Sequence, residues 1–284
     1  MAGDEKRFKA AFDSLHALAY FAPEVDAALT GIGLRPGRMP YFAGRSAAMG
    51  AVGPEVVAAT FYNFNPEVVA RVLPRAWTLA TPAQVLQARL DGVDKALTRL
   101  LGDHVKSDEV AEAAELAREA AAGCTGEGRP LYAAHAGLDW PGEPHLALWH
   151  AVTLIREYRG DGHIAALVLN GLSGIEALVT HVATGRGFVA GAAKLTRGWS
   201  DEQWAAAEAG LTGRGILDAD GGLTEAGAAL RDRVEIATEA AAQGPWQHLG
   251  AERTARLEEL GRGLSRRVVE AGAFPDGVFT RGRA

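Results

Sequence analysis

The chain has 284 residues, of which 48% are hydrophobic and 23% charged, which excludes disorder over most of its length and allows one large core or two smaller ones. The net charge is −6, so binding to DNA would require a local basic patch. The single cysteine, Cys124, excludes an intrachain disulfide and any metal site built from several cysteines.

The N-terminal residues indicate a cytoplasmic protein. Residues 1–9 have mixed charge and lack the apolar stretch of a signal peptide. No apolar run is long enough to cross a bilayer, so we expect a soluble chain that does not contact a membrane. Alanine, glycine and arginine are abundant while lysine is scarce, a bias typical of a GC-rich genome such as that of an actinobacterium.

Apolar residues at helical spacing and several capping signals predict a helical N-terminal half. Its predicted elements are, in order, a helix over 8–30 that Pro23 interrupts or restarts, a Gly- and Pro-rich loop with at most short helical turns over 31–53, a helix from Pro54 through Phe64, a helix from the Asn65-Pro66 cap to about Trp77, a long helix from the Thr81–Gln84 capping box through Leu100, and a helix over about 108–122 that Ser107 caps. Residues 123–144 contain several glycines and prolines, so we expect an irregular segment that separates two halves of the chain.

The C-terminal half is predicted to contain further helices and one hairpin. Its predicted elements are, in order, a helix over about 145–158 that stops at Arg159-Gly160-Asp161-Gly162, a short helix over 163–169, an Asn-Gly turn, a helix from the Ser173–Glu176 capping box to about Ala183, a helix from the Ser200–Gln203 capping box to about Gly213, a β-hairpin over 216–223, a helix over about 225–242, and an amphipathic helix over about 251–271.

This order of elements is that of a winged helix-turn-helix. The helix over 163–169, the Asn-Gly turn and the helix from Ser173 form the expected two-helix unit, and residues 214–227, RGILDADGGLTEAG, form the expected wing. The wing resembles that of MarR-type regulators, and this resemblance covers about residues 145–250. Long flanking helices build a dimer in that family, so the resemblance implies a homodimer.

Nearly the whole chain resembles a narrower family. The segments PYFAGRSAAMG, EVVAATFYNFNP, LWHAVTLIREYRGDGHIAALV and TRGWSDEQW are similar to an actinobacterial family described as SalK-like or simply as helix-turn-helix. The resemblance implies a fold and a lineage, and it implies no reaction. We therefore expect a mainly α-helical protein with a helical domain over 1–122, a connecting segment over 123–144, a winged helix-turn-helix with a short β-hairpin wing over 145–250, and a C-terminal helix and tail over 251–284.

The expected recognition helix lacks the cations that DNA binding requires. Residues 173–184 contain no Arg or Lys, and Glu176 is explained as the capping partner of Ser173. Asp218 and Asp220 in the wing would repel phosphate groups. We therefore expect DNA binding to be disfavoured and the helix-turn-helix to be retained as a scaffold.

A MarR-like, ligand-responsive DNA-binding regulator is the alternative. Residues 151–284 contain 15 basic and 17 acidic residues, so this half is slightly acidic as a whole. Four nearby cations could form a patch or could be ordinary solvated surface, and these are Arg186, Lys194, Arg197 and Arg214.

The densest polar cluster follows Pro144. On one face of the predicted helix over 145–158, His150, Thr153 and Glu157 are spaced at i, i+3 and i+7. Arg156 and Arg159 either complement the dipole at the end of this helix or bind a carboxylate or phosphate as a fork.

The turn after this helix holds a second pair of polar residues. Asp161 either caps the following helix or orients His163 as a general base. A metal site formed by His150, Glu157 and His163 is a further alternative, although no standard zinc motif is present, and we expect no metal. The sequence names no cofactor.

The polar pair Tyr62-Asn63 interrupts an apolar helix, and a buried asparagine must be hydrogen-bonded either to the protein or to a ligand. If the pair faces the His150 cluster, the two form a pocket with aromatic walls and a few polar anchors, as in small-molecule sites. We therefore expect a protein that binds, and could transform, an organic small molecule between its N-terminal helices and the helix that carries His150. The expected catalytic residues are His150, His163 and Asp161, and the expected ligand-binding residues are Tyr62, Asn63, Trp149, Arg156, Glu157 and Arg159. A histidine would act as proton shuttle or hydrogen-bond anchor, and an arginine would contact an anion.

Overall fold

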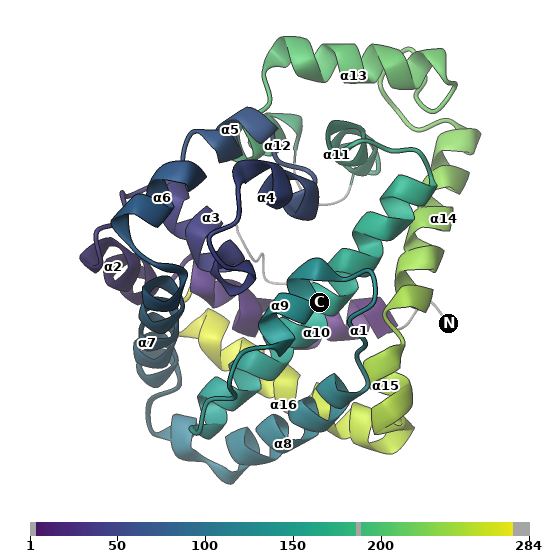
Figure 1. Ribbon diagram of the computed structural model, residues 1–284. Coiled ribbons are helices and arrows are strands. Elements are labelled where there is room, and N and C mark those ends of the chain that lie inside the picture. The colour runs from purple at the N-terminus through teal and green to yellow at the C-terminus, as the bar shows by residue number, and fades with distance from the viewer. Residues whose placement is uncertain (1–3, 186–188, 275–284) are drawn as a thin grey trace. The chain divides into compact units, whose positions relative to one another are not determined.

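Helices make up most of the residues that the computed structural model describes, which are 4–185 and 189–274 (Figure 1). The prediction of a mainly α-helical chain is therefore confirmed. The helices are, in chain order, α1 (Asp4–Ala17), η1 (Leu18–Tyr20), α2 (Pro23–Gly31), α3 (Arg38–Ser46), η2 (Ala47–Met49), α4 (Pro54–Phe61), α5 (Pro66–Ala70), α6 (Leu73–Leu79), α7 (Pro82–Leu101), η3 (Gly102–Lys106), α8 (Asp108–Ala122), α9 (Pro130–Ala136), α10 (Pro144–Leu169), α11 (Gly174–Val182), α12 (Ala190–Arg197), α13 (Asp201–Gly213), α14 (Glu225–Ala241), α15 (Gly244–Leu249) and α16 (Ala251–Glu270), where η denotes a 3-10 helix.

The chain divides into two units, each of which is assembled from separate stretches of sequence. The first unit comprises Met1–Ala51, Ala76–Tyr158 and Ala242–Ala284, and the second comprises Val52–Arg75 and Arg159–Ala241. This division differs from the predicted domains, because residues 52–75 belong with the C-terminal helices and the first part of α10 belongs with the N-terminal ones. The long helix α10 contributes to both units.

The predicted capping signals are present and explain where several helices begin. The side chains of Thr81, Ser173 and Ser200 each accept a hydrogen bond from the third backbone N–H of their helix, and the Gln or Glu at that position bonds back to the cap. Asn65 caps α5 and Ser107 caps α8 in the simpler one-sided way.

The first unit is held together by helices that are far apart in sequence. α7 packs against α2, and α1 packs against α16. Gly92 allows the close approach of α7 to α2, because a Cβ atom at this position would lie 2.6 Å from the Cα of Val25. The first part of α10 contacts α7 through Trp149 and Arg89 and α1 through Thr153 and His16.

The second unit has its own apolar core around α11. The fully or largely buried side chains of this core are Ala166, Leu167, Leu172, Ala177, Leu178, Val179, Ala193, Trp204, Leu211, Ile216, Leu217, Leu230 and Val234. α10 and α11 meet at 95°, and the turn between them contains Gly171 with a φ of 64°. The angle between α10 and α11 and the short turn that joins them are those of a helix-turn-helix, as predicted.

Two predictions of non-helical structure are wrong. Residues 38–46 form α3 where a loop was expected, because Met39, Phe42 and Ala43 are buried and this burial outweighs the low helix propensity of the glycines and Pro40. Similarly, α10 continues through Gly160 and Gly162 without a break. Each helical glycine costs about 1 kcal/mol, and the buried residues on both sides of the pair offset that cost.

Four smaller differences concern the ends and contents of predicted segments. The helix expected to reach Phe64 ends at Phe61, and the next one is divided into α5 and α6. The segment 123–144 contains the short helix α9, and α15 precedes the expected last helix.

The predicted β-hairpin wing is not seen as strands. Within the described part of the chain, only an isolated antiparallel bridge between Leu217 and Leu223 is present. The turn itself is formed, because the Asp218 carboxylate accepts hydrogen bonds from the backbone N–H groups of Asp220 and Gly222. Through these two bonds, Asp218 stabilises the turn.

Among the described residues, no single helix is long and apolar enough to span a bilayer. α10 and α11 satisfy the criteria of length and composition only when they are taken together, across their 95° bend.

Candidate functional site

The buried side of α10 carries the polar residues that the sequence placed on one helix face. Thr153 and Glu157 have 0% of their surface exposed, and His150 has 4%. Apolar neighbours such as Val152 and Ile155 bury this part of the helix and take the polar groups with them. A buried carboxylate is costly unless it is paired, so the position of Glu157 requires a cation.

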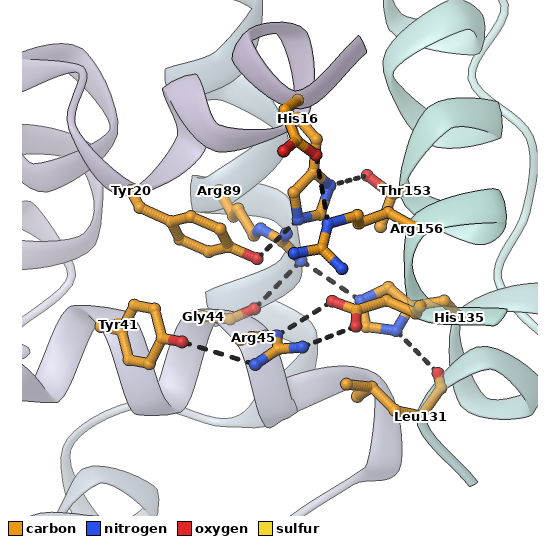
Figure 2. A network of polar contacts seen from close by, with 12 residues as sticks. His16, Tyr20, Tyr41, Gly44, Arg45, Arg89, Leu131, His135, Thr153 and Arg156 are labelled. Carbon is orange, nitrogen blue, oxygen red and sulfur yellow. Dashed lines mark hydrogen bonds and ion pairs between the residues drawn. The ribbon is translucent and has the colours of Figure 1, made fainter. Parts of the chain in front are cut away.

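Arg45 of α3 supplies this cation (Figure 2). Its Nε donates to Oε1 of Glu157 at 2.9 Å and one terminal nitrogen donates to Oε2 at 2.6 Å, which is the two-pronged geometry of a strong arginine–carboxylate pair. Burial alone would raise the pKa of Glu157, but the charge and hydrogen bonds of Arg45 outweigh burial and hold this pKa well below its usual range.

A second buried arginine lies beside this pair without a carboxylate of its own. Arg89, on α7, is 3% exposed, and its Nη1 donates to the carbonyl oxygen of Gly44 at 3.2 Å and to Nε2 of His135 at 3.3 Å (Figure 2). Its guanidinium also lies over the ring of Trp149, with 4.8 Å between Cζ and the ring centroid. Burial lowers the pKa of Arg89.

The histidines around Arg89 are neutral. Since a guanidinium can only donate, His135 accepts at Nε2 and donates from Nδ1 to the carbonyl oxygen of Leu131 at 2.9 Å. Burial, and then the charge of Arg89, lower the pKa of His135 to about 4. His150 has a pKa lowered to about 4 by burial and by the charges of Arg89 and Arg118. The cluster therefore gains no positive charge from these imidazoles at neutral pH.

His16 extends the network toward α1. Thr153 donates its hydroxyl hydrogen to the carbonyl oxygen of Trp149, so its oxygen accepts from Nδ1 of His16 at 3.4 Å (Figure 2). Nε2 of His16 then accepts from the hydroxyl of Tyr20 at 3.0 Å. Burial lowers the pKa of His16 well below its usual value and raises that of Tyr20 to about 12. Both groups are neutral hydrogen-bonding partners at pH 7.

Three buried nitrogens in this part of the first unit have no hydrogen-bond partner among the described residues. They are Nη2 of Arg89, Nε1 of Trp149 and Nε2 of His150. Trp140 packs edge-on against His150 with 4.8 Å between ring centroids, and Arg118 lies over Trp140 at 4.4 Å. The unpartnered nitrogens are thus bordered by aromatic rings, a combination common in small-molecule sites.

The structure brings together only some of the residues that the sequence proposed. Trp149, His150, Arg156 and Glu157 all lie on the part of α10 that belongs to the first unit. Arg156 forms an ion pair with Asp13 at 3.5 Å. The helix dipole does not explain this arginine, because α10 runs on to Leu169 and Arg156 lies in its interior.

The remaining proposed residues on α10 belong to the second unit. Arg159 lies 3.8 Å from Glu235 of α14, and Nδ1 of His163 forms a 2.9 Å hydrogen bond with the hydroxyl of Thr238. Asp161 is buried and, because the helix is continuous here, it does not cap a following helix.

Tyr62 and Asn63 also belong to the second unit, where they support the helix-turn-helix. The Tyr62 hydroxyl donates to the carbonyl oxygen of Leu172 at 2.5 Å, and the carbonyl oxygen of Asn63 accepts from the indole N–H of Trp199 at 2.9 Å. Tyr62 adopts a positive φ of 51°, and its carbonyl oxygen lies so close to Gly174 that a Cβ there would be 1.9 Å away. These contacts fix the start of α11.

α11 and α13, two described helices of the second unit, lack cations. α11 contains no Arg or Lys, and Glu176 accepts from Arg214 at 2.9 Å. α12 and α13 form a second helix–turn–helix pair around Gly198, and α13 has no Arg or Lys and begins with Asp201 and Glu202. Three of the four cations that could form a basic patch have contacts of their own: Lys194 pairs with Asp201, Arg197 stacks on Phe64, and Arg214 pairs with Glu176. The fourth, Arg186, lies outside the described residues.

Arg45, Arg89 and His135 were not predicted as site residues. For Arg89 the sequence held a signal, because it lies at i+4 from Val85 and i−4 from Val93 on the apolar stripe of a long helix. Arg45 and His135 lie in segments that were expected to be irregular. Across residues 4–185 and 189–274, no group of three His, Cys, Asp or Glu side chains is placed to hold a metal ion.

Comparison with known proteins agrees with this architecture. Neither the curated proteins nor the solved structures include a significant match to the chain. A helix-turn-helix family, in contrast, matches residues 5–275, which is nearly the whole chain. The right angle between α10 and α11, the apolar core around α11 and this match lead to one conclusion: the chain belongs to a helix-turn-helix family.

Proposed function

We propose that this protein binds an organic small molecule in its first unit, beside Trp149 and His150 of α10, and that its helix-turn-helix is retained as a scaffold. The observation that carries the proposal is the group of three buried nitrogens without a partner, on Arg89, Trp149 and His150. Leaving a buried donor unsatisfied costs about 1–3 kcal/mol. Three such groups beside aromatic rings support a site whose hydrogen bonds are completed by a ligand.

The pKa of His150 supports ligand binding better than it supports catalysis. A general base is most effective when its pKa lies near the working pH, whereas the pKa of His150 is lowered to about 4. A neutral imidazole of this kind is suited to anchor a ligand by a hydrogen bond. His163 and Asp161 belong to the second unit and are not part of the proposed site.

A thermal-shift screen of a small-molecule library tests this proposal. Compounds that raise the melting temperature of the wild-type protein should lose this effect in Trp149→Phe, which keeps an aromatic ring but removes the indole N–H together with part of the ring system. Trp246→Phe, at a half-buried position on α15, is the matched control and should keep the shift. Failure of every compound to shift the wild type, or an equal shift in Trp149→Phe, would contradict the proposal.

The second candidate is a MarR-like, ligand-responsive DNA-binding regulator. It is favoured by the 95° angle between α10 and α11 and by the glycine-containing turn that joins them. It is disfavoured by the absence of Arg and Lys from both α11 and α13. A gel-shift assay at low salt with the DNA upstream of the protein's own gene separates the two, and salt-sensitive, sequence-preferring binding would favour the regulator.

A further inference from the structure

The charges around Arg89 specify what kind of ligand the proposed site would take. Arg45 and Glu157 cancel each other, since both carboxylate oxygens of Glu157 are bonded by Arg45. Arg156 and Asp13 form a second neutral pair. Arg89 is left with neutral hydrogen-bond partners, the Gly44 carbonyl and the His135 imidazole. Arg89 therefore carries a buried positive charge that no carboxylate of this network neutralises, and a second, exposed cation, Arg118, lies over Trp140.

The hydrogen-bonding capacity of the unpartnered nitrogens adds a second requirement. Nη2 of Arg89 and Nε1 of Trp149 can only donate, so a ligand must offer acceptor atoms to both. Nε2 of His150 can donate or accept, according to its tautomer. A carboxylate has two oxygens, accepts several hydrogen bonds and supplies the single negative charge that Arg89 lacks.

We infer that the ligand is an organic monocarboxylate whose carboxylate group pairs with Arg89 and whose apolar body lies against Trp149 and Trp140. This inference rests on the proposed function and adds the chemical class of the ligand.

The aromatic rings next to the charged group favour a ligand with an apolar body. Trp149 lies under the Arg89 guanidinium, and Trp140 is half-buried beside His150. An inorganic anion would use the charge of Arg89 but none of this aromatic surface. The probes for the test are therefore benzoate, phenylacetate and indole-3-acetate, each paired with its neutral primary amide.

Isothermal titration of the full chain with these matched pairs tests the inference. We expect each acid to bind at least tenfold more tightly than its amide. Amides that bind as tightly as the acids would overturn the inference while leaving the proposed function intact. The inference would also be overturned if inorganic phosphate or sulfate bound as tightly as benzoate and competed with benzoate for the site.

Arg89→Gln should abolish the preference for acids over amides. Arg99→Gln is the control on the same helix, because Arg99 is partly exposed and already pairs with Glu24. If Arg89→Gln does not fold, Arg89→Lys is measured instead, and we expect it to keep a preference for acids with weaker binding, because a lysine keeps the charge but loses the planar fork. An unchanged preference in Arg89→Gln would overturn the inference. Failure of the proposed function would look different, since neither acids nor amides nor any library compound would then bind.

Discussion

At the scale of single residues, we expect the loss of the Arg45–Glu157 pair to lower the free energy of unfolding strongly. Glu157→Gln removes the charge that compensates a largely buried guanidinium, and breaking a buried pair in this way costs about 3–5 kcal/mol. We expect urea denaturation to show a decrease of this size in the free energy of unfolding. Glu67→Gln is the control, because its pair with Arg71 is exposed and should be worth less than about 1 kcal/mol. Equal effects of the two substitutions would contradict this account.

The buried neutral histidines make stability depend on pH. The pKa of His135 is about 4 in the folded chain and about 6.5 when unfolded, so between these values the unfolded state binds more protons. The free energy of unfolding should therefore fall as the pH decreases from about 6.5 to 4. The depressed pKa of Glu157 acts in the same direction, but only as the pH falls below its unfolded value of about 4.5.

Substitution of His135 tests whether this histidine causes the dependence of the free energy of unfolding on pH. Each such histidine contributes up to about 1.4 kcal/mol per pH unit, so urea denaturation of His135→Gln at pH 7 and pH 5 should show a smaller loss than the wild type. The exposed His248, replaced by Gln, serves as control and should leave the pH dependence unchanged. A wild-type protein that is as stable at pH 5 as at pH 7 would contradict the buried, neutral state of these histidines.

At the scale of elements, the segment before α5 fixes the turn between α12 and α13. Asn65 caps α5, its amide nitrogen donates to the Gly198 carbonyl at 3.0 Å and to the Gln203 side chain at 3.1 Å, and its backbone N–H donates to the Arg197 carbonyl. Asn65→Ala should therefore cost more than the loss of a cap alone, in total about 2–3 kcal/mol. Ser107→Ala, which removes only the cap of α8, should cost about 1 kcal/mol. Similar losses for both variants in chemical denaturation would show that the tertiary bonds of Asn65 add nothing.

The sequence predicted those elements whose ends are marked by local chemistry. The capping boxes at Thr81, Ser173 and Ser200 act within four residues and were all recognised. α3 and the continuous α10 were missed, because burial against distant helices overrides the local preference of glycine to end a helix.

Of the candidate site, the sequence predicted the residues on α10 and missed their partners on other helices. The spacing on α10 identified His150 and Glu157, since helix periodicity is a local property. The partner of Glu157 could not be predicted in this way, because Arg45 is 112 residues away in sequence and the two meet only through tertiary packing. The grouping of Tyr62 with the second unit likewise follows from contacts that no local pattern contains.

At the scale of the whole molecule, the resemblance to MarR-type proteins still predicts a homodimer, and the structure narrows which helix could form it. The apolar stripe of α16, with Leu257, Leu260, Leu264 and Val268, is buried within the chain, where α16 packs on α1 and α8. Ser265 even donates its hydroxyl hydrogen to the Ala11 carbonyl of α1 at 2.7 Å. A dimer built on α16 would have to break these contacts.

Of the two long C-terminal helices, α14 carries an exposed large apolar side chain, Ile236, which is 66% exposed. If this helix forms the dimer, light scattering after size exclusion should give twice the chain mass of 29.8 kDa for the wild type and a single chain for Ile236→Glu, since a charge at a dimer contact loses its hydration without a partner. Leu195→Glu, at a similarly exposed position on α12, should leave the mass unchanged. A wild-type protein that elutes as a single chain would remove the homodimer prediction, and a dimer that persists in Ile236→Glu would place the contact away from this side chain.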